Sequence, residues 1–223
     1  TLLQELNKRL YGGFLKASEI KALAIHTAYE AGLNPGPDYA FGWGLMNGKD
    51  AGRLILEENG DNKIIENHYL NDGETFTLDL NPVSGTDVKV TICWTDLPGS
   101  PVAAQLDPTD LMLVNDLDMR ISNESEEYFP YILDPLFPAR AATTGDNFRD
   151  NVEKIEFVAS GEPYKLSINH KGTLNDGGQS FSLIVTYEKE GSNTYYWIGG
   201  NNSEWTNPNN WSLTSAGAPA DQI

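Results

Sequence analysis

Helical periodicity marks three segments at the start of the chain. Leucines recur at helical spacing in LLQELNKRLY, which predicts a helix over residues 2–11 that ends at a glycine pair. A second helix is predicted over residues 19–31, with Ser18 as its N-cap and Gly32 as its stop. A turn rich in Gly and Pro follows, and a third short helix is predicted over residues 47–58.

The pattern changes after Gly60 to short apolar or alternating runs separated by turn residues. About eight strands are expected, with no helix among them, over residues 64–70, 75–80, 88–94, 118–122, 128–133, 152–158, 164–169 and 181–187. Such a succession is typical of a sandwich or jelly roll. We therefore expect a mainly β chain, with a jelly-roll β-sandwich over residues 59–190 preceded by a short helical segment over residues 1–58. The long connection over residues 96–115 indicates a functional loop.

Residues 191–223 differ again in composition, because they contain no basic residue and are rich in Asn, Gly and Trp. We interpret them as the start of a further β module. Trp197, Trp205 and Trp211 are expected to anchor the core of that module. The alternative is a platform of flat rings that stack on sugars.

The net charge of the chain excludes some classes of binding partner. The chain has a net charge of −17, and residues 59–190 hold most of the excess, with nine basic and twenty-three acidic residues. An acidic surface repels nucleic acid and anionic membranes, so we expect no nucleic-acid partner and no membrane insertion. The single cysteine, Cys93, lies in an apolar strand pattern and is expected to be a small core residue.

Acidic and amide side chains gather where the predicted strands end. Oxygen ligands of this kind are what Ca²⁺ prefers, and residues two apart on a strand share a face. We predict a calcium site whose candidate ligands are Asp96, Asp116, Asp118, Asp150 and Asn151, with Glu153 and Asp146 in reserve. The alternative is that these are ordinary turn residues and a solvated edge.

No constellation for nucleophilic catalysis is recognisable. The sequence Ser84-Gly85-Thr86 falls in a strand turn, and none of the three histidines, His26, His68 and His170, has a Ser or Cys partner at a recognisable motif. We expect these histidines to be core or surface residues, and zinc-type spacings of His and Cys are absent.

Residues 1–58 resemble the end of the catalytic domain of subtilisin-like serine proteases. LLQELNKRLYGG is similar to the segment after the nucleophile helix, and SEIKALAIHTA is similar to the next family helix. The segment YAFGWGLMNGKDAGRLI matches the closing motif, through Gly42, Gly44, Asn47 and Ala51. Physically, the glycines allow close backbone packing, and Asn47 can cap the last helix.

Residues 59–190 resemble the jelly-roll domain, similar to the P domain of proprotein convertases, that follows the catalytic domain in some bacterial subtilases. The matching stretches are VTICWTD, VNDLDMRI, DNVEKIEF and YKLSINH, in that order. The tail is similar to short repeats of secreted multidomain proteins.

The resemblance implies a fragment of a secreted or cell-surface bacterial endopeptidase. The chain begins at Thr1 inside an apolar helical pattern, so the catalytic Asp, His and Ser of the family are expected upstream, together with the pockets that hold the protein substrate. Two alternatives are a carbohydrate- or protein-binding module and a structural spacer. Without the catalytic sheet, we expect residues 1–58 to fold back on the β domain or to associate with a second copy.

Overall fold

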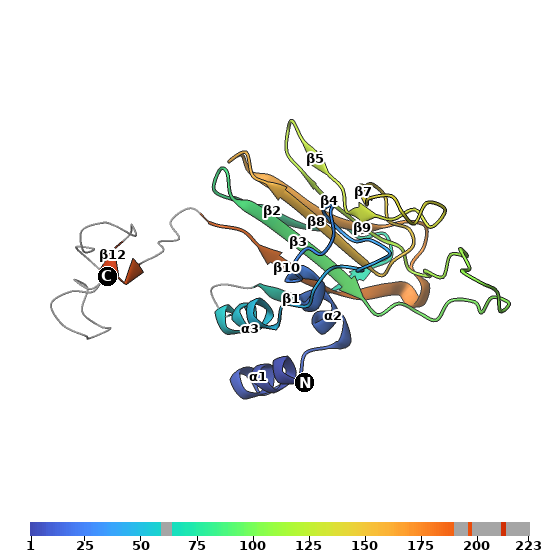
Figure 1. The fold of residues 1–223 in the computed structure, drawn as a ribbon, viewed down its shortest axis with the longest axis horizontal. Helices are drawn as coiled ribbons and strands as arrows, with labels where there is room; N and C mark the ends of the chain where they lie inside the picture. The colour runs from blue at the N-terminus through green and yellow to red at the C-terminus, as the bar shows by residue number, and fades with distance from the viewer. Residues whose placement is uncertain (59–63, 190–195, 198–210, 213–223) are drawn as a thin grey trace. The chain divides into compact units, whose positions relative to one another are not determined.

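The fold is given by a computed structural model that describes residues 1–58, 64–189, 196–197 and 211–212 (Figure 1). The chain divides into two compact units, residues 1–188 and 189–223. In the second unit, strands β11 (Tyr196–Trp197) and β12 (Trp211–Ser212) pair antiparallel. Trp205 and most of the predicted tail module lie outside the described residues.

Three helices begin the first unit: α1 (Leu2–Tyr11), α2 (Ala17–His26) and α3 (Gly48–Glu57). Helix α1 ends at Gly12, which adopts a φ of 77°. The Asn47 side chain caps α3 as predicted, since its oxygen accepts the Asp50 amide at 3.0 Å. None of the described helices has the length and apolar character needed to cross a membrane.

Helix α2 differs from its predicted bounds at both ends. The Glu19 carboxylate accepts the Lys16 amide and begins the helix, while Ser18 is buried and its hydroxyl accepts a hydrogen bond from Ser182 at 2.7 Å. The helix ends at His26 because Tyr29 is held in a backbone bridge with Leu45, with N–O distances of 2.9 and 2.8 Å. The predicted continuation to residue 31 is therefore wrong.

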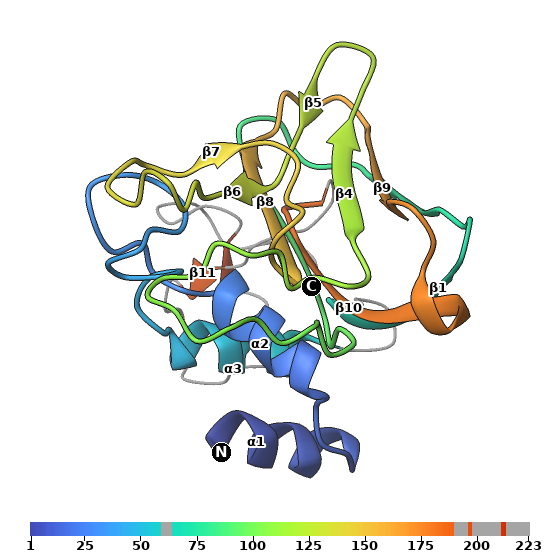
Figure 2. The same cartoon turned by 90° about the vertical axis from the view of Figure 1, so that its right-hand side faces the viewer.

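Two four-stranded antiparallel sheets form the sandwich (Figures 1 and 2). The first sheet has the order β1-β10-β3-β8 and the second has the order β2-β9-β4-β5, so the long strands alternate between the sheets along the chain. The strands of the two sheets are β1 (Ile65–Asn71), β2 (Phe76–Leu80), β3 (Asp87–Trp94), β4 (Leu117–Ser122), β5 (Glu127–Tyr128), β8 (Val152–Val158), β9 (Tyr164–His170) and β10 (Gly178–Thr186). The molecule is thus mainly β, a β-sandwich preceded by a short helical segment, as expected.

One predicted strand is divided. Instead of a strand over residues 128–133, β5 is followed by Pro130 and then by β6 (Tyr131–Ile132). Proline has no amide hydrogen for a sheet, which explains the interruption. Strand β6 leaves the second sheet to pair with β7 (Thr143–Thr144), which was not predicted.

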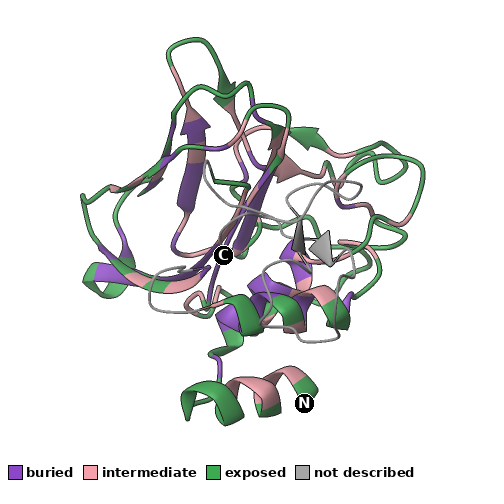
Figure 3. Ribbon diagram, turned by 90° about the vertical axis from the view of Figure 1, so that its left-hand side faces the viewer, coloured by how far each residue is buried: buried purple, intermediate pink, exposed green. Residues whose placement is uncertain are grey.

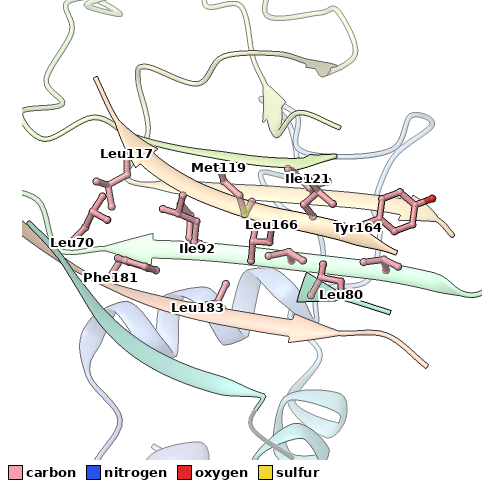
Figure 4. Packing of buried hydrophobic residues seen from close by; sticks show 14 of the residues in the cluster. Leu70, Leu80, Ile92, Leu117, Met119, Ile121, Tyr164, Leu166, Phe181 and Leu183 are labelled. Carbon is pink, nitrogen blue, oxygen red and sulfur yellow. The ribbon is translucent and has the colours of Figure 1, made fainter. Parts of the chain in front are cut away.

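The main core lies between the two sheets. On β4, the inward side chains are Leu117, Met119 and Ile121, all fully buried, and they face apolar side chains of the first sheet (Figure 4). Trp94, at the end of β3, belongs to this core and is 1% exposed.

A second core lies between the helices and the outer face of the first sheet. Helices α2 and α3 cover one apolar patch, formed by Cys93, Val152 and Ile184. This confirms that the helical segment folds back on the β domain and that Cys93 is a core residue. Helix α1 packs on α3 but buries none of its residues (Figure 3).

Candidate functional site

The richest group of charged side chains lies where β4 meets the edge strand β8. We call it the acidic cluster and define it by four carboxylates and two cations: Asp116, Asp118, Asp146, Glu153, Arg120 and Lys171. Strand alternation places Asp118 and Arg120 on the face of β4 opposite to its apolar residues. The other members come from β8 and from the segments that precede β4, precede β8 and follow β9.

Two cations hold two of the carboxylates. Asp118 Oδ1 lies 3.2 Å from Arg120 Nη2 and 3.3 Å from Lys171 Nζ. Asp146 contacts the same two cations, with 3.5 Å between its Oδ1 and Arg120 Nη2 and a direct ion pair with Lys171. Asp118 is 5% exposed, so its charge depends on these partners.

The environment separates the pKa values of these two carboxyls. Burial raises the pKa of Asp118 above its ordinary value. Burial also acts against ionisation of Asp146, but hydrogen bonds from Lys171 and Asp118 outweigh it, and the pKa of Asp146 is lowered. The two acids therefore differ in their affinity for a proton, although they share their cations.

The environments of Asp116 and Glu153 both raise the pKa of the carboxyl. Burial, followed by the charge of Asp118, raises the pKa of Asp116 to about 6. Burial raises the pKa of Glu153 well above its usual range, while a hydrogen bond from the Met119 amide acts in the opposite direction. Asp116 Oδ1 and Glu153 Oε1 are both buried and have no hydrogen-bond partner among the described residues.

The remaining predicted ligands hold loops instead of joining the cluster. Asp96 accepts the amides of Val114 and Asn115 at 2.6 and 2.9 Å, and so closes the long loop that follows β3. Asp150 is exposed, and its carboxylate accepts a hydrogen bond from the Asn147 side chain at 3.3 Å.

Asn151 joins the start of β8 to its neighbours. Its amide donates to the Trp94 carbonyl at 2.6 Å, and its oxygen accepts a hydrogen bond from Lys21 of α2. Of the five predicted calcium ligands, the structure therefore brings only Asp116 and Asp118 together. Asp146 and Glu153, the two reserves, complete the group.

Arg120 and Lys171 are the members that sequence reasoning missed. They supply the compensating positive charge that the sequence interpretation assigned to calcium. Across residues 1–58 and 64–189, no group of three or more His, Cys, Asp or Glu side chains is placed to hold a metal ion. Calcium binding stays a prediction that a measurement must decide.

A separate polar contact fixes α2 on the first sheet. The His26 ring lies between two threonine hydroxyls, with 3.0 Å from Nδ1 to Thr91 Oγ1 and 2.9 Å from Nε2 to Thr186 Oγ1. Burial, followed by the charges of Lys154 and Lys89, lowers the pKa of His26 to about 3. The ring is therefore neutral and serves as a structural clamp.

The other two histidines also make local contacts. His68 lies 3.1 Å from the Glu66 carboxylate, and His170 accepts the Gly73 amide at 2.6 Å. None of the three histidines is hydrogen-bonded to a Ser or Cys side chain in the described part of the chain.

No protein-family model matches the chain, and no curated protein matches it.

Proposed function

We propose that this chain is the C-terminal part of a secreted bacterial subtilisin-like serine endopeptidase. Its β-sandwich is an accessory domain that stabilises the protease or orients the protein substrate. The order of the motifs in residues 1–58 and 59–190 supports this proposal, and the β-sandwich that follows three helices agrees with it.

The observation that carries the proposal is the apolar outer surface of residues 1–58. Helix α1 exposes Leu2 and Leu10, and the connection between α2 and α3 exposes further large apolar side chains: Leu33, Tyr39, Phe41, Leu45 and Met46. Leu33 is fully exposed and Leu2 is 80% exposed. Such a surface is expected where helices normally pack against more protein, here the catalytic sheet of the protease.

Local geometry at the closing motif supports the same proposal. Gly44 has a φ of 100°, and a Cβ placed there would lie 2.1 Å from the Tyr29 carbonyl oxygen. Only glycine allows the backbone to approach so closely. Together with the cap at Asn47, this reproduces the local roles that the resemblance implies.

The alternative of a carbohydrate-binding module gains no support from the second sheet. Its outer face carries Thr77, Lys165, Ser167, Arg120 and Ser122, as the strand register indicates. Phe129, which directly follows β5, packs there against Arg120, with 4.7 Å from the guanidinium carbon to the ring centroid, and the described strands place no row of aromatic side chains on that face to stack on a sugar.

The test is the sequence upstream of Thr1 together with active-site labelling. The proposal expects a Gly-Thr-Ser-Met-Ala-like motif about one helix length before Leu3. The longer protein should react with a fluorophosphonate probe and cleave casein, and residues 1–223 alone should do neither. Stoichiometric labelling of residues 1–223 alone, or an upstream sequence without the motif, would refute the proposal.

Deletion of residues 64–189 from the longer protein separates the two roles of the sandwich. A stabilising domain would be revealed by a lower melting temperature with unchanged initial rates. A substrate-orienting domain would be revealed by a raised KM for casein, with KM unchanged for a short chromogenic peptide.

A further inference from the structure

We infer that the loop over residues 97–113, which follows β3, binds extended polypeptide segments that carry apolar and basic side chains. If the bound segment is a substrate of the protease, the loop is an exosite, and that interpretation rests on the proposed function. The inference that the loop binds peptides does not rest on it. The loop projects from the end of β3 (Figures 1 and 2). Its shape, exposed side chains, free backbone and charge each contribute to the inference.

Three contacts along its length give the loop a defined shape. At its base, Asp96 binds the amides of Val114 and Asn115. In the middle the two limbs touch, because a Cβ on Gly99 would lie 2.5 Å from the Met112 carbonyl oxygen. Near the tip, Gln105 Nε2 donates to the Asp110 carboxylate at 2.9 Å.

An outside contact and three prolines hold this shape further. The Arg149 guanidinium donates to the Thr109 carbonyl oxygen at 2.9 Å and ties one limb to the loop before β8. Pro98, Pro101 and Pro108 restrict the backbone, so the loop loses less conformational entropy when it binds a partner.

Large apolar side chains point outward from this held loop. Leu106 is 90% exposed and Leu111 is 56% exposed, while Val102 and Met112 are each more than 40% exposed. Isolated exposed apolar residues are common, but four within this one loop indicate a surface that is stabilised when a partner covers it.

The backbone of the loop favours a polypeptide as the covering partner. Within the described part of the chain, residues 97–113 make no backbone–backbone hydrogen bond, and only the Thr109 carbonyl has a side-chain partner. The other amides and carbonyls are free to pair with the main chain of an extended segment, while apolar side chains of that segment meet the leucines. A lipid or sugar would not use both features.

The negative charge of the loop favours a bound segment that carries positive charge. Asp107 and Asp110 are its only charged residues, and they lie between its two most exposed leucines, Leu106 and Leu111. Residues 59–190, to which the loop belongs, contain nine basic and twenty-three acidic residues, although Arg149 contacts the loop at the Thr109 carbonyl. Lys or Arg side chains on the bound segment would therefore be attracted, and acidic ones repelled.

Fluorescence anisotropy with labelled peptides tests this inference on residues 1–223. The peptides are repeats of Gly-Leu-Lys, with matched peptides in which Glu replaces Lys or Ser replaces Leu. The double variant Leu106→Ser with Leu111→Ser should weaken binding of the Gly-Leu-Lys peptide by about tenfold or more, equivalent to at least about 1.4 kcal/mol, because both leucines lose the apolar area that the peptide would cover. Asp107→Asn with Asp110→Asn should also weaken binding and should reduce its dependence on salt.

Leu136→Ser is the matched control, since Leu136 is 72% exposed on a different loop. All of the replaced side chains are exposed, so melting temperatures should match the wild type. The inference fails if the wild type does not bind the Gly-Leu-Lys peptide, if the leucine variant binds as tightly as the wild type, or if the Glu peptide binds equally well. A dimeric wild type whose leucine variant is monomeric by light scattering would assign the loop to self-association and overturn the inference. None of these outcomes depends on the peptidase test.

Discussion

The Met119 amide on β4 donates a hydrogen bond of 2.6 Å to the carboxylate of Glu153 on β8. Strand β5 pairs with β4 only at Ile121 and Ser122, so the amide of Met119 has no neighbouring strand on that side. A buried side chain from the other sheet thus supplies the acceptor that a longer β5 would have supplied. The contact ties the edges of the two sheets together.

Replacing Glu153 should show how much this contact contributes to stability. Glu153→Ala leaves the Met119 amide buried without an acceptor and creates a void, so the free energy of unfolding should fall by about 2–4 kcal/mol. Glu153→Gln keeps an acceptor and should lose less than half as much. Urea unfolding monitored by Trp fluorescence gives both values, and equal losses in the two variants would show that the acceptor is unimportant.

The dependence of stability on pH should reflect Asp116, whose pKa is raised to about 6 in the folded protein by burial and then by the charge of Asp118. A carboxyl with a raised folded pKa stabilises the protein most below its unfolded pKa, and this contribution is lost as the pH rises through the folded value. From pH 3.8 toward 6 the wild type loses this contribution and Asp116→Asn does not, so the free energy of unfolding of the variant should increase relative to that of the wild type across this range. Asp87→Asn, at an exposed position on β3, is the control, and its difference from the wild type should not change with pH. The unfolding series is recorded with a chelator present, and a difference between Asp116→Asn and the wild type that stays constant from pH 3.8 to 6 would contradict the assignment.

Calcium is tested by thermal unfolding in millimolar Ca²⁺, in Mg²⁺ and in chelator. A site of the predicted kind should raise the melting temperature with Ca²⁺, by an amount equivalent to about 2.7 kcal/mol at a hundredfold excess over the dissociation constant. Mg²⁺ should have a smaller effect, because it requires a tighter octahedral shell.

The double variant Asp116→Asn with Asp118→Asn should lose the calcium response. Its melting temperature should also be lower in chelator, since Arg120 and Lys171 lose the partner that Asp118 provides. If the wild type melts at the same temperature in calcium and in chelator, the calcium prediction is wrong. Arg120 and Lys171 are then the cations that compensate the carboxylates of the cluster.

The His26 clamp should be sensitive to both substitution and acid. His26→Ala removes the partner of two hydroxyls and leaves a cavity under α2, so a loss of about 2–4 kcal/mol is expected. Because the folded pKa is lowered from 6.5 to about 3, the stabilisation is complete above the unfolded value and is lost as the pH falls through this range. Thr91→Val, which removes one hydroxyl at nearly constant volume, should lose only about 1 kcal/mol. If His26→Ala unfolds with the same pH dependence as the wild type, the ring is not the titrating group.

Strands could be predicted well because each long one carries a local signal. On β4 the apolar residues alternate with Asp118 and Arg120, and β3 is a nearly continuous apolar run with turn residues on either side. The end of α2 could not be predicted in this way, since it depends on the pairing of Tyr29 with Leu45 across a loop. Pro130, by contrast, was a local signal in the sequence for the break between β5 and β6.

Only part of the acidic cluster could be predicted, for a similar reason. Asp116 and Asp118 are neighbours in the sequence, and Arg120 follows on the same face, so their proximity can be inferred from strand alternation. Lys171 reaches Asp118 because β9 pairs with β4, and Glu153 arrives from the other sheet. Asp96 lies near these strand ends in the sequence but is occupied by the amides of its own loop. The order of the strands in the sheets decides which acidic side chains lie close together, and that order cannot be inferred from short stretches of sequence.

Strands β3 and β10 have a buried layer on each side, with the sandwich core on one face and α2 on the other. Their amide hydrogens should therefore exchange with solvent only when the whole first unit opens, and more slowly than those of the edge strand β1. For the same reason, a recombinant fragment that starts at Ile64 would expose Cys93, Val152 and Ile184 on the outer face of strands β3, β8 and β10 and should aggregate. The helices that precede the sandwich are thus part of its smallest soluble form.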